Sequence, residues 1–312
     1  MLLIVLAVAV NQRQNIQDWF KLRGYQPPAA VVQLAGQDTM NSYTRHLFYL
    51  NKPQLLSTVS SFRRYCPEDK NTIVLGCYHP GQNGIFIYNV PDPALAGVQQ
   101  VTAAHEVLHS VYARLSSKDR AALNNELNDF YKHGLTDQRV LAEVRIYQQT
   151  EPNDVMDEMS CTFGTELAIL PAPLEAYYKK YFDNRPAIVA YEQQYQGEFT
   201  SRQNAIKADD QQLADSKAQI DAQKTALTYQ FSQINSDKNH LDSLRSAGQI
   251  DAYNAAVPGY NNEIRIYNAG VDKLHNAVDA YNQLVASRNQ IASELTTLET
   301  ALDTRQLPQA AQ

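Results

Sequence analysis

Two histidines and a glutamate in the middle of the chain have the types and the spacing of a metal site that activates water. His105, Glu106 and His109 form an H-E-x-x-H sequence within a helical pattern that runs from Leu95 to Leu115. Residues four apart lie on the same face of a helix, so both imidazoles can bind one ion. Zn²⁺ accepts neutral imidazole nitrogen and, in a catalytic site, keeps a position for water. Glu106 lies about 100° further round the helix, where it can reach that water as a general base.

The same residues have a simpler explanation, which is a pair of surface histidines in ordinary i,i+4 contact. The rest of the helix favours the metal site. It has a separate apolar stripe with steps of three and four residues, formed by Val101, Ala104, Leu108, Val111 and Leu115. The histidines flank this stripe, as ligands that line a buried cleft would.

The sequence around the motif resembles that of the zincin metallopeptidases. Thr102 lies three residues before the first histidine, and Glu106 is the only acidic residue between Ala103 and Val111. The resemblance covers roughly residues 40 to 185. It implies a small sheet before the motif helix, with an edge strand that aligns an extended peptide. The residues at that place, which are implied to align the substrate, are Ile85, Phe86, Ile87 and Tyr88.

A hydrolytic zinc site needs a third protein ligand. The metzincin continuation, with a glycine and a third histidine soon after the motif, is absent, and the gluzincin arrangement, with a glutamate on a later helix, fits better. The helix predicted at Asp154–Ile169 carries Glu158 and Glu166. We prefer Glu158 as the ligand, with Glu166 as the alternative ligand or as a supporting residue paired with Arg185. Glu143 and His133 are lesser alternatives, and either helix glutamate can also be an ordinary solvated charge.

Two further roles follow from the resemblance. Thr162 stands four residues after Glu158, where many gluzincins have an aspartate that orients the first histidine, so that role has no candidate. Tyr112, three residues past His109, is a candidate for stabilising an oxyanion, although packing in the core is the preferred alternative.

Around the motif, the sequence predicts a mixed α+β fold. A strand is predicted at Ser42–Leu50 and a helix from Pro53 to Phe62. Two runs rich in β-forming residues, Thr72–Tyr78 and Ile85–Val90, flank a turn-rich connection and predict a hairpin. The helical patterns that follow lie at Leu95–Leu115, Lys118–Tyr131, Asp137–Gln149 and Asp154–Ile169.

The last third of the chain has the periodicity of a coiled coil. Apolar residues recur every seven positions at Ile206, Leu213, Ile220, Leu227, Ile234 and Leu241. From Tyr260 to Val285 the apolar spacing alternates between four and three. We expect two antiparallel helices broken by Gly248, Pro258 and Gly259. The first helix has a thin seam, so its packing is either loose or completed by another chain.

Composition limits the function. The 312 residues carry 27 Lys and Arg against 33 Asp and Glu, a net charge of −6, which excludes a strongly basic nucleic-acid-binding protein. Three cysteines exclude a disulfide-dense scaffold. Cys66 and Cys77 are close enough in sequence to close a short disulfide loop outside the cytosol, or they are two free buried thiols. Cys161 is expected to be a small buried apolar residue.

The first ten residues are entirely apolar, but a bilayer-spanning helix needs about 20 such residues. We interpret residues 1–12 as the remnant of a membrane anchor or signal segment, with a buried strand as the alternative. Residues 13–190 are then the zincin-like domain, and residues 191–312 form the helical hairpin. This organisation predicts a membrane-anchored or secreted protein whose catalytic domain lies outside the cytoplasm.

The sequence therefore predicts a zinc-dependent peptidase in which Zn²⁺ is held by His105, His109 and Glu158, with Glu106 as general base. Its partners would be a peptide or protein substrate, a membrane at its N-terminus, and a protein or a second copy at the coiled coil. The alternative is a catalytically silent zincin-fold protein that acts through its coiled coil. A metal hydrolase that attacks another type of bond is a third possibility, because the motif specifies only water activation.

Overall fold

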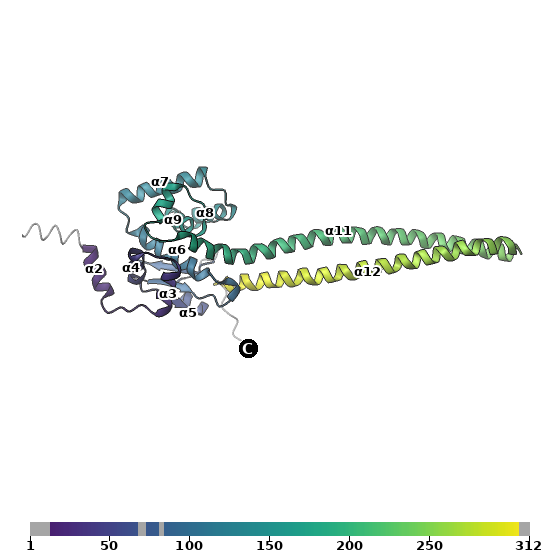
Figure 1. The fold of residues 1–312 in the computed structure, drawn as a ribbon, viewed down its shortest axis with the longest axis horizontal. Helices are drawn as coiled ribbons and strands as arrows, with labels where there is room; N and C mark the ends of the chain where they lie inside the picture. The colour runs from purple at the N-terminus through teal and green to yellow at the C-terminus, as the bar shows by residue number, and fades with distance from the viewer. Residues whose placement is uncertain (1–12, 68–72, 81–83, 306–312) are drawn as a thin grey trace, which may run out of the picture. The chain divides into compact units, whose positions relative to one another are not determined.

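The computed structural model describes residues 13–67, 73–80 and 84–305, which divide into two compact units (Figure 1). The first unit contains the described residues up to Glu198 together with those from Leu298 onward, and the second is Phe199–Thr297. The first combines helices with a small sheet and the second is a helical hairpin, so the α+β fold class with a hairpin is confirmed. The anchor remnant expected at residues 1–12 lies outside the described residues. None of the described helices is long and apolar enough to cross a membrane.

The first unit begins with α2 (Arg13–Leu22), α3 (Ala29–Gln37) and α4 (Ser42–Leu50). The strand predicted at Ser42–Leu50 is therefore wrong. Two local features favour a helix there. Asn41 caps it by accepting a hydrogen bond from the backbone N–H of Thr44, and the buried residues Thr44, Leu47 and Phe48 have helical spacing.

The sheet has three strands in the order β1-β3-β2. β2 (Gly76–His79) pairs antiparallel with β3 (Gly84–Tyr88), which confirms the predicted hairpin with shorter strands. β1 (Gln54–Leu56) pairs parallel with β3 and occupies part of the helix predicted from Pro53, so only α5 (Val59–Arg63), capped by Thr58, is helical there. β3 is the central strand, buried along its whole length, and β2 lies at one edge. The prediction that Ile85, Phe86, Ile87 and Tyr88 form an edge strand is wrong, because hydrogen bonds occupy both sides of their backbone.

The motif helix α6 (Val98–Ala113) lies at the centre of the first unit. It packs against α9 (Val155–Glu166) and against α3, α4, β2 and β3. A short 3₁₀ turn, η1 (Pro93–Leu95), precedes α6. Gly97 is the N-cap residue of α6 and has a φ of 109°, which favours glycine. The buried residues of α6 include Ala104, Leu108 and Val111, so the predicted apolar stripe is part of the core. The remaining helices of this unit are α7 (Ser117–His133), α8 (Gln138–Thr150) and α10 (Ala172–Tyr178).

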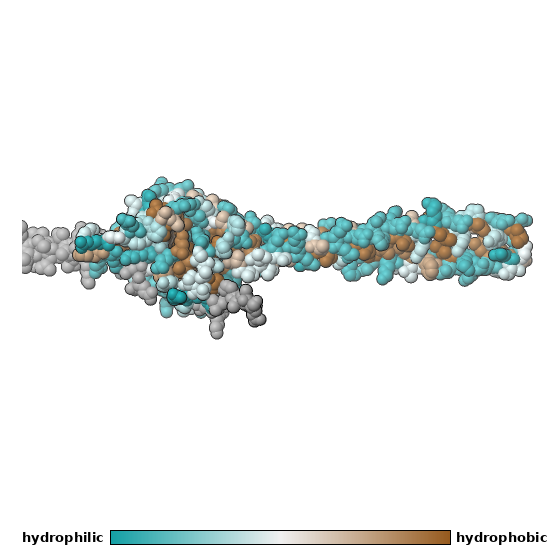
Figure 2. All heavy atoms as spheres, turned by 90° about the horizontal axis from the view of Figure 1, so that it is seen from below, coloured by the Kyte–Doolittle hydropathy of each residue, from teal (hydrophilic) through white to brown (hydrophobic). Residues whose placement is uncertain are grey.

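The hairpin consists of α11 (Arg185–Ser246) and α12 (Ile250–Leu302). The turn between them is at Gly248, whose φ of 73° favours glycine. The break predicted at Pro258 and Gly259 is wrong, because α12 continues through both residues. The seam is thin, as expected: within this unit the buried apolar residues among those described are Leu227, Ile234 and Leu241. Figure 2 shows apolar residues in a line along the hairpin between hydrophilic ones.

Candidate metal centre

α6 and α9 bring together the three residues that the sequence proposes as metal ligands. The Nε2 atom of His105 lies 3.5 Å from Oε2 of Glu158, and Nε2 of His109 lies 3.6 Å from Oε1 of the same carboxylate. All three side chains are largely buried, with 13–16% of their surface exposed. One carboxylate therefore faces both imidazoles. Burial would raise the pKa of Glu158, but the two histidines outweigh it and hold that pKa below its ordinary value, which keeps the carboxylate ionised.

The structure adds Asp157, which sequence reasoning missed. Its Oδ1 atom lies 2.9 Å from Nδ1 of His109. A carboxylate at Nδ1 fixes the ring orientation and leaves Nε2 as the nitrogen that can bind a metal. Burial alone would lower the pKa of His109, but Cys161, Asp157 and Glu158 outweigh it and raise that pKa well above its ordinary value. The one feature of the sequence that could have indicated Asp157 is its position next to Glu158 in the first turn of α9.

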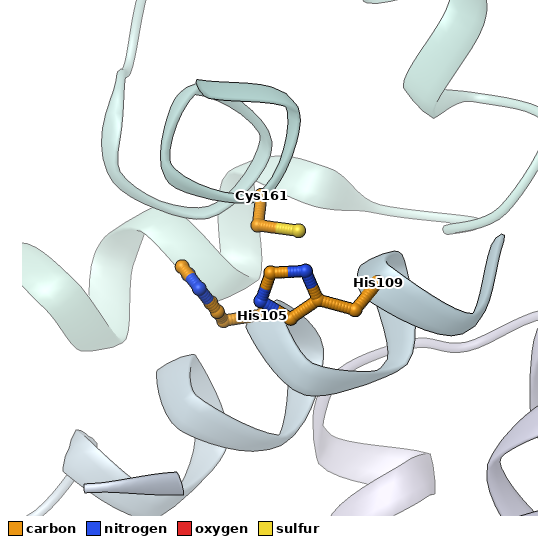
Figure 3. A group of neighbouring side chains, drawn as sticks. All are labelled: His105, His109 and Cys161. Atoms are coloured by element: carbon orange, nitrogen blue, oxygen red, sulfur yellow. The ribbon is translucent and has the colours of Figure 1, made fainter. Parts of the chain in front are cut away.

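Cys161 also faces the histidines, from the next turn of α9 (Figure 3). Its sulfur and a nitrogen of each histidine lie within 4.8 Å of one another. The prediction that it is buried is confirmed, since none of its surface is exposed, but its place beside the histidines was not foreseen. Its sulfur lies 3.8 Å from Oδ1 of Asp157, the oxygen that faces Nδ1 of His109. Glu158 faces Nε2 instead, and one imidazole offers only one nitrogen to a given ion. Glu158 and Cys161 therefore approach His109 from the sides of different ring nitrogens.

Glu106 lies on the same helix and lines the cleft, with 5% of its surface exposed. Burial raises its pKa above the ordinary value, against the effect of the two histidines. β2 approaches it at Gly76, where a Cβ would lie 2.6 Å from Oε1 of Glu106 and 2.5 Å from Cγ2 of Thr102. Only glycine allows the strand to lie so close to this carboxylate. Sequence reasoning missed Gly76, because only the fold shows what approaches it.

The site opens into a cleft of about 630 Å³. One wall is β2, whose Tyr78 ring lies parallel to the imidazole of His109 with ring centres 6.4 Å apart. A face of α8 that includes Glu143 and Tyr147 also lines the cleft, and the Tyr147 hydroxyl donates a hydrogen bond of 2.9 Å to Glu143. Tyr78 and Tyr147 therefore both line the cleft, and neither residue was a candidate from the sequence.

Two residues that the sequence offered for the site, one as an oxyanion stabiliser and one as an alternative ligand, form hydrogen bonds or ion pairs with other residues. Tyr112 is 8% exposed, belongs to the core and donates its hydroxyl hydrogen bond to Asn124 at 3.0 Å, so the structure favours the packing alternative over the oxyanion role. Glu166 lines the cleft, but its carboxylate is paired with Arg139 at 2.5 Å. The pairing of Glu166 with Arg185 is wrong, because Arg185 binds Glu175.

The two lesser alternatives for the third ligand differ in their positions. Glu143 lines the cleft but is bound to Tyr147, and His133 is largely exposed and pairs with Asp129 on its own helix. Cys66 and Cys77 form a disulfide, which confirms the loop-closing alternative. Cys77 belongs to β2 and lines the cleft, so the disulfide anchors the cleft strand to the chain that follows α5.

The chain matches no family model, no curated protein and no solved structure. Its function must therefore be inferred from the residues and their geometry.

Proposed function

We propose that the protein is a zinc-dependent peptidase of the zincin type. The observation that supports this most directly is that Glu158 faces the Nε2 atoms of His105 and His109 while Glu106 lies in the same cleft. Two imidazoles and one carboxylate are a common donor set of catalytic zinc sites. The low exposure of these donors and the contact of Asp157 with His109 fit such an ion.

The ligands would be His105, His109 and Glu158, and the bound ion would lower the pKa of water and polarise the scissile carbonyl. The remaining steps belong to the chain. Glu106 takes a proton from the attacking water on its carboxylate and delivers it to the leaving amine nitrogen. Gly76 keeps the strand β2 against that carboxylate. β2 also replaces β3 as the strand that aligns the substrate, because it lies at the edge of the sheet and lines the cleft.

We propose further that the protein works outside the cytosol. The Cys66–Cys77 disulfide supports this compartment, because disulfides persist in oxidising surroundings and are rare in the cytosol.

Glu106→Gln tests the function. The zinc-loaded protein should cleave members of a mixed peptide library, and the variant should lose about 10²–10⁴-fold in rate because it lacks the proton acceptor. Zinc content should stay near that of the unchanged protein, since Glu106 is not a ligand. Glu126→Gln, at an exposed position of α7, is the matched control and should change neither quantity. Full hydrolysis by Glu106→Gln would refute the mechanism. Bound zinc without cleavage of any peptide would favour the catalytically silent alternative.

A further inference from the structure

The walls of the cleft have a strong excess of negative charge. Glu106, Asp157 and Glu158 belong to the proposed zinc site. Glu143, Glu151 and Asp154 also line the cleft, and none of these three has a place in the proposed chemistry. Among the described residues that line the cleft, Arg139 is the only lysine or arginine.

Arg139 does not offset these carboxylates, because its charge is already matched. Its guanidinium pairs with Glu166 at 2.5 Å and with Glu192 at 2.9 Å. Glu166 alone matches the charge of Arg139, and Glu192 and Glu143, the latter at 3.6 Å, add partial negative charge, because burial raises the pKa of both to about 7. The cleft therefore has a negative potential apart from any bound ion.

The unassigned carboxylates follow one wall in order. Glu143 and Tyr147 are four residues apart on α8, so they lie on one face with a rise of about 6 Å between them, and Glu151 is the capping residue just after the last turn of this helix. Asp154 follows where α9 begins. The hydrogen bond from Tyr147 holds the Glu143 carboxylate in place. A long cationic side chain lying along this wall would meet several carboxylates in succession.

A second observation indicates that the cleft is built to receive a ligand. Glu106 is more than nine-tenths buried and lines the cleft, and no hydrogen bond to its carboxylate comes from another described residue. A buried polar group of this kind requires a partner that enters from the cleft.

We propose that the cleft selects peptides with a lysine or arginine side chain next to the bond that is cut, and that Glu143 and Asp154 receive that side chain. This rests on the proposed peptidase function, in which the substrate backbone lies along β2 in the cleft that α8 also lines. The recognition is electrostatic, so it depends on ionic strength and on charge more than on shape.

The test uses three fluorogenic peptides that differ at one position beside the cut and carry Lys, Gln or Glu there. For the zinc-loaded protein we expect kcat/KM about tenfold higher for the Lys peptide than for the Gln peptide, and lowest for the Glu peptide. Added salt should reduce the preference. Glu143→Gln and the exposed Asp154→Asn should each reduce the Lys preference several-fold, whereas Glu126→Gln should leave it unchanged. Asp154→Asn keeps the test valid if the change at Glu143 disturbs folding.

A binding measurement separates the two proposals. Glu106→Gln, loaded with zinc, should bind the Lys peptide more tightly than the Glu peptide by fluorescence polarisation. Cleavage of all three peptides at equal rates would overturn the selectivity while leaving the peptidase function intact. Preferential binding of the Lys peptide without cleavage by the unchanged protein would support the selectivity of the cleft and contradict the peptidase function.

Discussion

The two units of the chain bury their side chains in different ways. In the first unit, the buried side chains form a large core cluster and a smaller one beside α5, and the helix that carries both histidines packs against five other elements. In the second unit, the buried apolar residues among those described are three, Leu227, Ile234 and Leu241, all on one helix. Several of its other apolar side chains are exposed, including Tyr229 and Phe231.

This difference shows where a precise site can form. Side chains hold a fixed geometry when their own helices are fixed by packing on several sides, which is the situation of α6 and α9. The seam between two helices holds the hairpin together while burying few side chains. We therefore expect substitutions in the first unit to change stability and the proposed zinc binding together, and substitutions in the second to change only the stability of the hairpin.

The largest effect is expected from Leu108→Ala, compared with Ile234→Ala. Leu108 is fully buried between the histidine turns of α6, and its loss should destabilise the first unit by about 2–5 kcal/mol and reduce zinc content. Ile234 lies in the thin seam, so its loss should cost about 1–2 kcal/mol, below that range, and leave zinc content unchanged. Chemical denaturation followed by circular dichroism measures the first quantity and metal analysis the second. Equal loss of zinc in both variants would contradict the comparison.

The disulfide should have the next largest effect, again confined to the first unit. Cys66 and Cys77 enclose a loop of eleven positions, so replacing both with serine should cost about 3 kcal/mol of unfolding free energy. Because Cys77 belongs to the strand that lines the cleft, peptide cleavage should fall as well. Dithiothreitol should reproduce the loss in the unchanged protein and have no effect on the double variant, which is the control. Unchanged stability after complete reduction would contradict this prediction.

The part of the candidate site whose geometry could be anticipated follows from helical periodicity. The four-residue spacing of His105 and His109 places both on one face, and the position of Glu158 on a later helix is sufficient to propose it as a ligand. Asp157, Cys161 and Gly76 were missed because their roles depend on which elements become neighbours. Gly76 meets Glu106 only after β2 has packed on α6, and no local pattern encodes that contact.

The fold was predicted to a similar extent. The helices α6 to α9 were predicted within three residues of their observed ends, because their apolar periodicity extends over several turns, whereas the start of α12 was expected only after Gly259. The position of β3 in the sheet was wrong because β1 has only three residues, too few for a recognisable pattern, and its parallel pairing joins distant segments. Ser42–Leu50 was mistaken for a strand because its aromatic and β-branched residues favour strands, while its cap and burial pattern require a helix.

Pro258→Ala tests the corrected position of the hairpin turn. Proline inside a helix removes one hydrogen bond and crowds the preceding turn, so alanine should stabilise the hairpin by about 1–3 kcal/mol. Zinc content should not change. Gly248→Ala is the contrasting variant: it should destabilise the hairpin, because the residue at the true turn has a positive φ. Destabilisation by Pro258→Ala would instead indicate that the proline forms part of the turn.

The smallest effect is expected from acid, and it also differs between the units. Asp18 of α2 is 4% exposed and binds Arg114, at the end of α6, with hydrogen bonds of 2.7 and 2.8 Å. Burial would raise the pKa of Asp18, but Arg114 outweighs it and holds that pKa below its ordinary value. A depressed pKa in the folded state means that the pair stabilises the protein above the unfolded pKa of about 3.9 and loses this contribution as the pH falls through the folded pKa.

Asp18→Asn should therefore cost about 1.5 kcal/mol at pH 7, the lower end for hydrogen bonds to a charged group, because Arg114 is partly exposed. The difference between the variant and the unchanged protein should shrink towards zero as the pH falls below about 4. Lys217 and Asp221 of the hairpin form an ion pair of 2.6 Å, but both are exposed, so Asp221→Asn should have no measurable effect at either pH. Denaturation midpoints at pH 7 and pH 3 measure both pairs. If the two substitutions changed the unfolding free energy equally, the difference in burial between the two ion pairs would not determine their contribution to stability.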